Sequence, residues 1–192
     1  VGVGWQGSEY EALDESFENR GARMSEAIEV LRQYFTEPCV DFRGEFYHST
    51  AMAMEPKPPQ GAGLPIWIGA RAASALRRVG THADGWLANA FFDDKEVKIC
   101  KDIIFSAASD SGRDPESIGY QTQFDAPPRD EEGKQFYANL DRVAARALQI
   151  REQGFEQAAI NVTAIFQSGA RSVEAMIETL GNVYDRVRSE VG

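Results

Sequence analysis

The clearest chemistry in the sequence is anion binding, at the junction between a short apolar segment and the helix that follows it. Residues 65–69 end on Gly69, and Ala70, Arg71, two alanines and Ser74 come next. The first backbone N–H groups of a helix have no intrahelical acceptor, and the helix dipole favours negative charge there. Small side chains let a phosphate approach the backbone, while Arg71 adds a charged donor and Ser74 a hydroxyl. The alternative is an ordinary tight turn with a solvated arginine.

The sequence gives little support for metal-dependent catalysis, serine hydrolysis or P-loop phosphoryl transfer. His48 and His82 are the only histidines, and no group of His, Cys, Asp or Glu has the spacing of metal ligands. Neither a Gly-x-Ser-x-Gly elbow nor a Gly-x-x-x-x-Gly-Lys loop occurs. Cys39 and Cys100 are too few for a disulfide framework or a zinc site, so a reducing cytoplasm is the expected compartment.

Composition and charge narrow the class of protein. The 192 residues are 43% hydrophobic and 26% charged, as in soluble globular domains with a real core. A formal net charge of -10 repels phosphate backbones and anionic lipids, so neither nucleic acid nor a membrane surface is an expected partner. No apolar run approaches the roughly 20 residues that span a bilayer. A small molecule is the expected ligand.

Strands and amphipathic helices alternate along the chain. Met24, Ile28 and Leu31 recur at spacings of three and four, which predicts a helix over 17–35. A hairpin is expected around Arg43 and Gly44, and a loop over 125–132. The expected strands are 1–4, 65–69, 83–90, 118–124 and 157–162. Further helices are expected from Gly69 to a C-cap at Gly80, and over 94–108, 134–153 and 172–188.

Five strand–helix units predict a parallel sheet covered by helices. Two architectures fit this pattern, an open doubly wound sheet and part of an eight-fold βα barrel. A barrel needs eight units and about 250 residues. The alternation alone therefore favours the open sheet.

Five motifs in order change that interpretation. They are Gly2-Val3-Gly4-Trp5, the stretch from Phe17 to Glu26, Phe42-Arg43-Gly44-Glu45-Phe46-Tyr47, residues 65–69, and Ala83-Asp84-Gly85-Trp86. In order and spacing the chain resembles the luciferase-like monooxygenase family over nearly its whole length. Within that family it looks most similar to the oxidoreductases that depend on the deazaflavin coenzyme F420.

The resemblance implies a fold. Members are (β/α)8 barrels with an insertion after the fourth strand, so residues 1–192 are expected to be one barrel domain that begins at that strand. The first three βα units of the pattern would be absent, and residues 37–64 would form the insertion. The expected fold class is thus α/β, a partial TIM barrel of about five βα units.

The resemblance also implies roles for particular residues. Gly69, Ala70, Arg71 and Ser74 match the positions that hold the phosphate of F420 or FMN. Trp5 would pack against the flat ring of that cofactor or form part of the wall around its phosphate. Tyr47 and His48, in the insertion, would face the substrate. No catalytic residue is assigned, and Asp84 to Trp86 are expected to be mainly structural.

Two functions follow from this resemblance. The first is an oxidoreductase or monooxygenase that uses F420 or FMN for hydride transfer to or from a small organic substrate. The second is an inactive, truncated barrel that acts as a binding or oligomer-forming protein. Open sheet edges and an uncovered apolar face favour association. We therefore expect a homo-oligomer, or missing units supplied by residues outside the chain.

Overall fold

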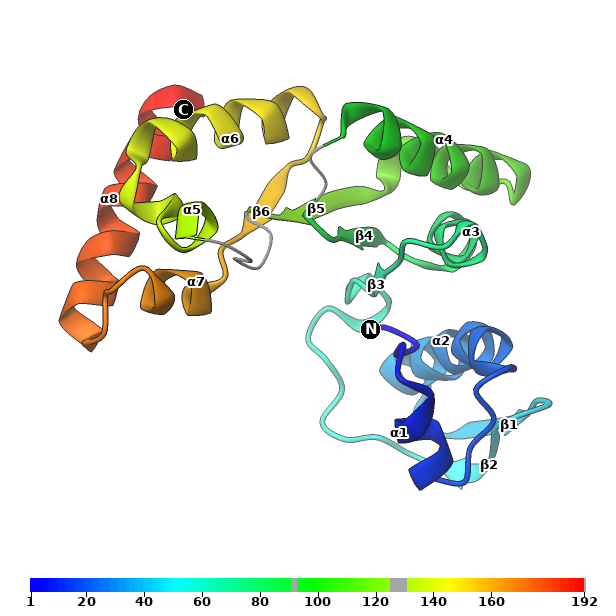
Figure 1. Cartoon of the computed structure of the whole chain (residues 1–192). Coiled ribbons are helices and arrows are strands. Elements are labelled where there is room, and N and C mark those ends of the chain that lie inside the picture. The colour runs from blue at the N-terminus through cyan, green and yellow to red at the C-terminus, as the bar shows by residue number, and fades with distance from the viewer. Residues whose placement is uncertain (91–92, 125–130, 192) are drawn as a thin grey trace. The chain divides into compact units, whose positions relative to one another are not determined.

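The computed structural model describes residues 1–90, 93–124 and 131–191, which belong to two compact units. The first unit comprises Val1–Trp86 and Asp102–Ile118, and the second comprises Leu87–Lys101 and Gly119–Gly192. The first contains α1 (Gly7–Ala12), α2 (Arg20–Thr36), β1 (Val40–Arg43), β2 (His48–Met52), β3 (Trp67–Gly69) and α3 (Ala73–His82) (Figure 1). Residues of β4 (Gly85–Ala88) and α4 (Asp94–Asp110) occur in both units. The second contains β5 (Gly119–Gln123), α5 (Glu131–Lys134), α6 (Leu140–Glu152), β6 (Gln157–Ala159), α7 (Val162–Gln167) and α8 (Val173–Val191).

The main sheet has the strand order β3-β4-β5-β6, the same as the order along the chain. Between β5 and β6 the pairing is parallel, with Gln121 opposite Gln157 and Thr122 opposite Ala158. In a doubly wound sheet the strand order reverses partway along. The observed order is that of strands around a barrel wall, so the open-sheet interpretation of the alternation pattern is wrong.

The first residues of the chain lie along the outer edge of β3. Val1 donates its N-terminal NH₃⁺ to the Trp67 carbonyl at 2.6 Å, and the Gly69 N–H donates to the Val1 carbonyl at 2.9 Å. One residue that bonds to both neighbours of the residue opposite is the pattern of a parallel pair. No strand is assigned over 1–4, but this segment occupies the strand position that the sequence predicted.

Gly80 does not end its helix, as the sequence predicted, because α3 continues to His82. A Cβ at Gly80 would lie 2.4 Å from the Ile104 carbonyl oxygen and 2.8 Å from the Ala107 Cβ. Both of these residues belong to α4. Gly80 is therefore needed for the close approach of two helices.

The C-terminal third contains more and shorter helices than the sequence predicted. In place of one helix over 134–153 there are α5, a 3-10 helix (Phe136–Ala138) and α6. The Asn139 side chain accepts the Arg142 N–H and so fixes the start of α6 at Leu140. Similarly, Asn161 accepts the Thr163 N–H and starts α7, a helix that the sequence analysis missed. Of the loop expected at 125–132, residues 125–130 lie outside the described residues.

Each unit has its own apolar core. Fully buried side chains in the first unit include Ile28, Ile68, Leu76, Val79, Trp86 and Ile104, and those in the second include Val97, Tyr137, Val143, Ile165 and Val183. Among the described residues, no helix combines the length and apolar character that a bilayer crossing requires.

Candidate phosphate site at the turn between β3 and α3

The start of α3 leaves backbone donors without acceptors. Ala72 precedes the helix in an extended conformation and offers no side-chain cap. The N–H groups of Ala75 and Leu76 both donate to the Ala72 carbonyl at 2.9 Å. Within the described part of the chain, the N–H groups of Ala73 and Ser74 have no acceptor. Their residues are exposed, so an anion can reach both donors from solvent.

Trp86 supports the turn between β3 and α3. Its side chain is fully buried, and its indole N–H donates to the Ala70 carbonyl at 2.8 Å. Ala70 is itself buried, whereas Gly69 and Arg71 on either side of it are exposed. The turn is thereby tied to β4, the neighbouring strand. The structure thus brings Gly69, Ala70, Arg71 and Ser74 together on one supported turn.

The electrostatic setting of this turn favours an anion despite the acidic chain. The first turn of α3 carries no acidic residue, whereas Asp94, Asp141 and Glu174 occupy the first turns of α4, α6 and α8. Carboxylates in those positions neutralise a helix dipole. At α3 the dipole is left uncompensated and Arg71 adds positive charge beside it.

Trp5 lies at the same sheet edge, and its side chain is mostly exposed. Because residues 1–4 run parallel to β3, Trp5 follows at the carboxyl end of that segment, the edge where the 69–74 turn also lies. Its side chain is 84% exposed. An aromatic ring this exposed is available to a flat ligand, and its contact with a cofactor stays a prediction.

Tyr47 and His48 are positioned by α2. The Glu26 carboxylate of α2 accepts the N–H groups of Glu45 at 2.9 Å, Phe46 at 3.0 Å and Tyr47 at 2.6 Å. A Cβ on Gly44 would lie 2.1 Å from a Glu26 carboxylate oxygen, so a side chain there would displace the carboxylate from the turn between β1 and β2. Two of the sequence motifs, the stretch from Phe17 to Glu26 and residues 42–47, are therefore connected, because a carboxylate of the first holds the hairpin turn of the second.

These contacts between the Glu26 carboxylate and the hairpin turn, the Glu26 clamp, also affect the ionisation of Glu26. Burial raises the pKa of Glu26, but the three backbone N–H donors outweigh it and hold the pKa below its usual value. His48, which is exposed, contributes in the same direction through its charge. The contacts place Tyr47 and His48 with α2, and their proximity to a substrate stays a prediction.

Asp84 is structural, in agreement with the sequence prediction. Its carboxylate pairs with Arg32 at 2.9 Å and accepts the Ile66 N–H at 2.7 Å. Arg113 lies 3.9 Å from the other carboxylate oxygen and donates to the Ala83 carbonyl at 2.7 Å. Asp84 precedes β4, so this network joins the amino ends of the strands, opposite to the 69–74 turn.

Sequence reasoning missed Lys101 of α4. Its ammonium donates to the carbonyls of Gln153 at 2.7 Å and Gly154 at 2.5 Å, beyond the C-terminus of α6. It also lies over the rings of Tyr120 and Phe155. Burial lowers the pKa of Lys101 to about 8, against the opposing charge of Glu156. Only the tertiary fold brings these groups together, so no local pattern could have indicated the contact.

Comparison with known proteins identifies the family. The family model of the luciferase-like monooxygenases matches residues 1–178. The chain therefore belongs to the luciferase-like monooxygenase family, as its ordered motifs predicted.

Its relatives include named F420-dependent enzymes. The chain is 27% identical over 184 residues to the F420-dependent glucose-6-phosphate dehydrogenase of Nocardia farcinica, an alignment that covers 91% of this chain and 52% of the relative. It is 26% identical over 150 residues to the F420-dependent hydroxymycolic acid dehydrogenase of Mycobacterium tuberculosis, covering 77% of this chain and 41% of that enzyme. The chain thus spans about half the length of these relatives.

A solved structure confirms the fold. The monooxygenase RslO1 from Streptomyces bottropensis superposes on all of this chain and 68% of its own, with a TM-score of 0.76 and 18% identity. The predicted fold class, part of a (β/α)8 barrel, is therefore confirmed.

Proposed function

We propose that the protein is an oxidoreductase that holds the phosphate of F420 or FMN at the start of α3. The observation that carries the proposal is the pair of acceptor-free N–H groups of Ala73 and Ser74, exposed on a turn that Trp86 supports. Family membership and the F420-dependent relatives support the cofactor class. Both cofactors present a phosphate, so this site suits either one.

The residues of the turn divide the work of binding. The N–H groups of Ala73 and Ser74 donate to phosphate oxygens, with the Ser74 hydroxyl as a further donor. Arg71 supplies a positive charge, and charge-assisted bonds are about twice as strong as neutral ones. Gly69 and the two alanines leave the backbone accessible. The bound cofactor supplies the redox chemistry, hydride transfer at its central ring, and the protein supplies binding and orientation.

The substrate would lie on the side of the β1–β2 hairpin. Tyr47 and His48 would contact a small organic molecule there, on a turn that Glu26 holds in place. Trp5 would cover one face of the cofactor ring, because it is exposed at the same sheet edge as the phosphate turn.

Cofactor titration tests the proposal. The purified chain is titrated into F420 and, separately, FMN, while cofactor fluorescence is followed. We expect saturable binding of one of them, weakened about tenfold, or about 1.4 kcal/mol, by Arg71→Ala and about threefold by Ser74→Ala. Arg77→Ala is the matched control, since Arg77 is exposed on the same helix beyond its first turn.

The same titration addresses the alternative of an inactive binding protein. If the wild-type chain binds neither cofactor, or if Arg71→Ala and Ser74→Ala bind as well as Arg77→Ala, the phosphate assignment is wrong. A chain that binds a cofactor through the turn has kept the binding step of an oxidoreductase.

A further inference from the structure

Lys101 of α4 extends away from its own helix and lies among groups from two other segments. Its ammonium donates to the Gln153 and Gly154 carbonyls at 2.7 and 2.5 Å, just beyond the C-terminal end of α6. The ring centroids of Tyr120 and Phe155 lie 4.3 and 4.6 Å from the same nitrogen. We call these two carbonyls and two rings the Lys101 cage. Among the described residues, no carboxylate forms an ion pair with this ammonium.

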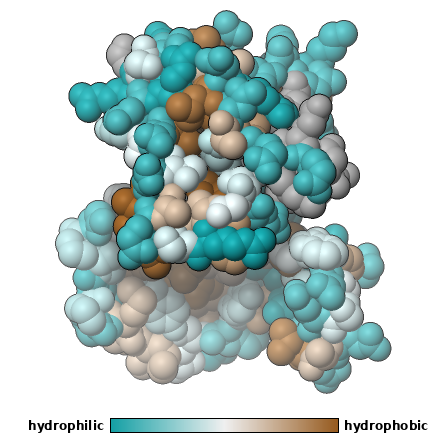
Figure 2. All heavy atoms as spheres, turned by 60° about the vertical axis from the view of Figure 1, so that its left-hand side comes forward, coloured by the Kyte–Doolittle hydropathy of each residue, from teal (hydrophilic) through white to brown (hydrophobic). Residues whose placement is uncertain are grey.

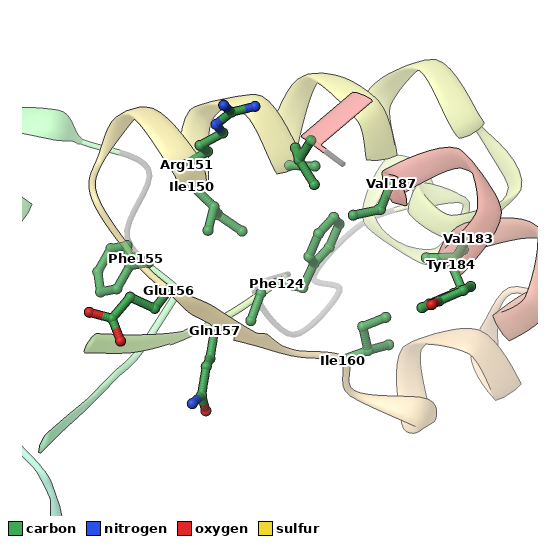
Figure 3. A pocket seen from close by; sticks show the side chains of 13 residues that line it. Phe124, Ile150, Arg151, Phe155, Glu156, Gln157, Ile160, Val183, Tyr184 and Val187 are labelled. Atoms are coloured by element: carbon green, nitrogen blue, oxygen red, sulfur yellow. The ribbon is translucent and has the colours of Figure 1, made fainter. Parts of the chain in front are cut away.

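The cage is built around an interior strand of the sheet. Tyr120 belongs to β5, which has β4 on one side and β6 on the other. In Figure 3 the Phe155 ring lies where α6 leads into β6, at the opposite side of the view from Val187 of α8. Gly154 has a φ of +71°, and a Cβ there would lie 3.0 Å from the Lys101 Nζ. A glycine therefore both ends α6 and leaves room for the amine.

The amine is held but can be reached from solvent. The hydrogen bond to the Gln153 carbonyl is partly buried, whereas the one to the Gly154 carbonyl is exposed. Gly154 and Glu156 are themselves exposed. A small reagent can therefore approach the Lys101 nitrogen from the Gly154 side.

Partial burial also changes how much of the amine is neutral. It lowers the pKa of Lys101 to about 8, against the opposing charge of Glu156. At pH 7 about a tenth of such a group is neutral, compared with about one in 2,500 for an ordinary lysine with a pKa of about 10.4. Only the neutral amine has a lone pair with which to attack a carbonyl carbon. Because a less basic amine is a weaker nucleophile, the gain in rate is smaller than the gain in neutral amine.

The overall charge of the chain acts on every lysine and does not select among them. The formal net charge is -10, and hydrophilic side chains, in teal, cover much of the face shown in Figure 2. Lys95 lies on the same helix, six residues before Lys101, and is exposed. A difference in reactivity between these two lysines therefore reports on the cage.

We propose that Lys101 is a nucleophilic lysine that acyl phosphates modify. The amine nitrogen forms a bond to the acyl carbon, the bond from that carbon to the phosphate oxygen breaks, inorganic phosphate leaves with the electron pair, and an amine proton passes to water. The product amide has one N–H where the ammonium had three. It can therefore donate to only one of the Gln153 and Gly154 carbonyls, so modification removes one link between α4 and the end of α6. The proposed phosphate site takes no part, so the two proposals fail independently.

Timed exposure of the purified chain to acetyl phosphate, followed by peptide mass spectrometry, tests the proposal. At pH 7 we expect Lys101 to be acetylated about fivefold faster than Lys95, or more. The rate at Lys101 should level off above about pH 8, while that at Lys95 keeps rising to about pH 10. In concentrated urea, where the cage is lost, the ratio of the two rates should fall to about one.

Two controls separate reactivity from a purely structural link. Lys57 also donates to two backbone carbonyls but lies 3.9 Å from the Glu55 carboxylate, so it should react more slowly than Lys95. Lys101→Arg keeps the positive charge and should lose the fast acetylation, with an unchanged circular dichroism spectrum. Acetylation of Lys101 no faster than that of Lys95 in the folded chain, or a ratio that urea leaves unchanged, would overturn the proposal. So would a fast phase that survives in Lys101→Arg.

Discussion

Replacing Gly80 with alanine should destabilise the first unit, although alanine is the better helix former. The added Cβ would lie 2.4 Å from the Ile104 carbonyl oxygen and 2.9 Å from the Ala108 nitrogen, against 3.4 Å or more for ordinary contacts. Both are backbone atoms and cannot rotate away, so α3 and α4 must move apart by about 1 Å. Overpacking costs about 1–3 kcal/mol, and a Cβ this close to two backbone atoms belongs in the upper part of that range, about 2–3 kcal/mol. Helix propensity returns about 1 kcal/mol, which leaves a net loss of about 1–2 kcal/mol.

Thermal unfolding followed by circular dichroism measures this loss. For a chain of this length we expect Tm to fall by about 2–8 °C. Gly21→Ala is the matched control. A Cβ at Gly21 would meet the Arg78 guanidinium at 2.6 Å, but that group ends a flexible side chain and can swing aside. The control should melt at or above the wild-type Tm. A Gly80→Ala protein that melts as high as the wild type would refute the close-approach explanation.

Three further substitutions test side chains that form hydrogen bonds to distant parts of the chain, namely Glu26, Lys101 and Trp86. Glu26→Gln should destabilise the protein at pH 7, and the difference should shrink as the pH falls below about 4. The pKa of Glu26 is lowered in the folded chain, so its contribution is lost on protonation, as urea unfolding at several pH values would show. Lys101→Met should remove a rise in stability between about pH 8 and pH 10. The unfolded chain, with an ordinary lysine pKa of about 10.4, binds more protons in that range than the folded chain with a pKa of about 8. Trp86→Phe should leave the Ala70 carbonyl without its indole donor at a cost of about 1–3 kcal/mol, seen as a lower Tm and weaker cofactor binding.

Local patterns in the sequence predicted the elements that carry strong periodicity or turn residues. The apolar run before Gly69 and the amphipathic stretch around Ile28 correspond to β3 and α2. The hairpin around Gly44 was also predicted correctly. In each case the residues that decide the structure are neighbours along the chain.

One failed prediction depends on distant residues, and two others concern local helix caps. Gly80 is of the residue type preferred at a helix C-cap, yet its role depends on Ile104 and Ala107 in another helix. Asn139 and Asn161 start helices inside segments that were predicted to continue as a helix and a strand. Both caps are local signals, since Asn is a preferred N-cap residue.

The candidate phosphate site likewise combines residues that are neighbours in the sequence with contacts from distant ones. Gly69, Ala70, Arg71 and Ser74 are contiguous, so the turn could be predicted from local sequence and the ordered motifs. Its support by Trp86 could not, because that hydrogen bond spans 16 residues. The clamp from Glu26 to the hairpin turn spans about 20 residues and links two motifs that were noted separately.

The N–H groups at the start of α3 provide the most direct test of the phosphate site. In ¹⁵N–¹H correlation spectra of the labelled chain, the resonances of Ala73 and Ser74 should shift strongly as F420 or FMN is added. Those of residues in α8 should stay in place. Binding of either cofactor with the Ala73 and Ser74 resonances unmoved would contradict the proposed role of this turn.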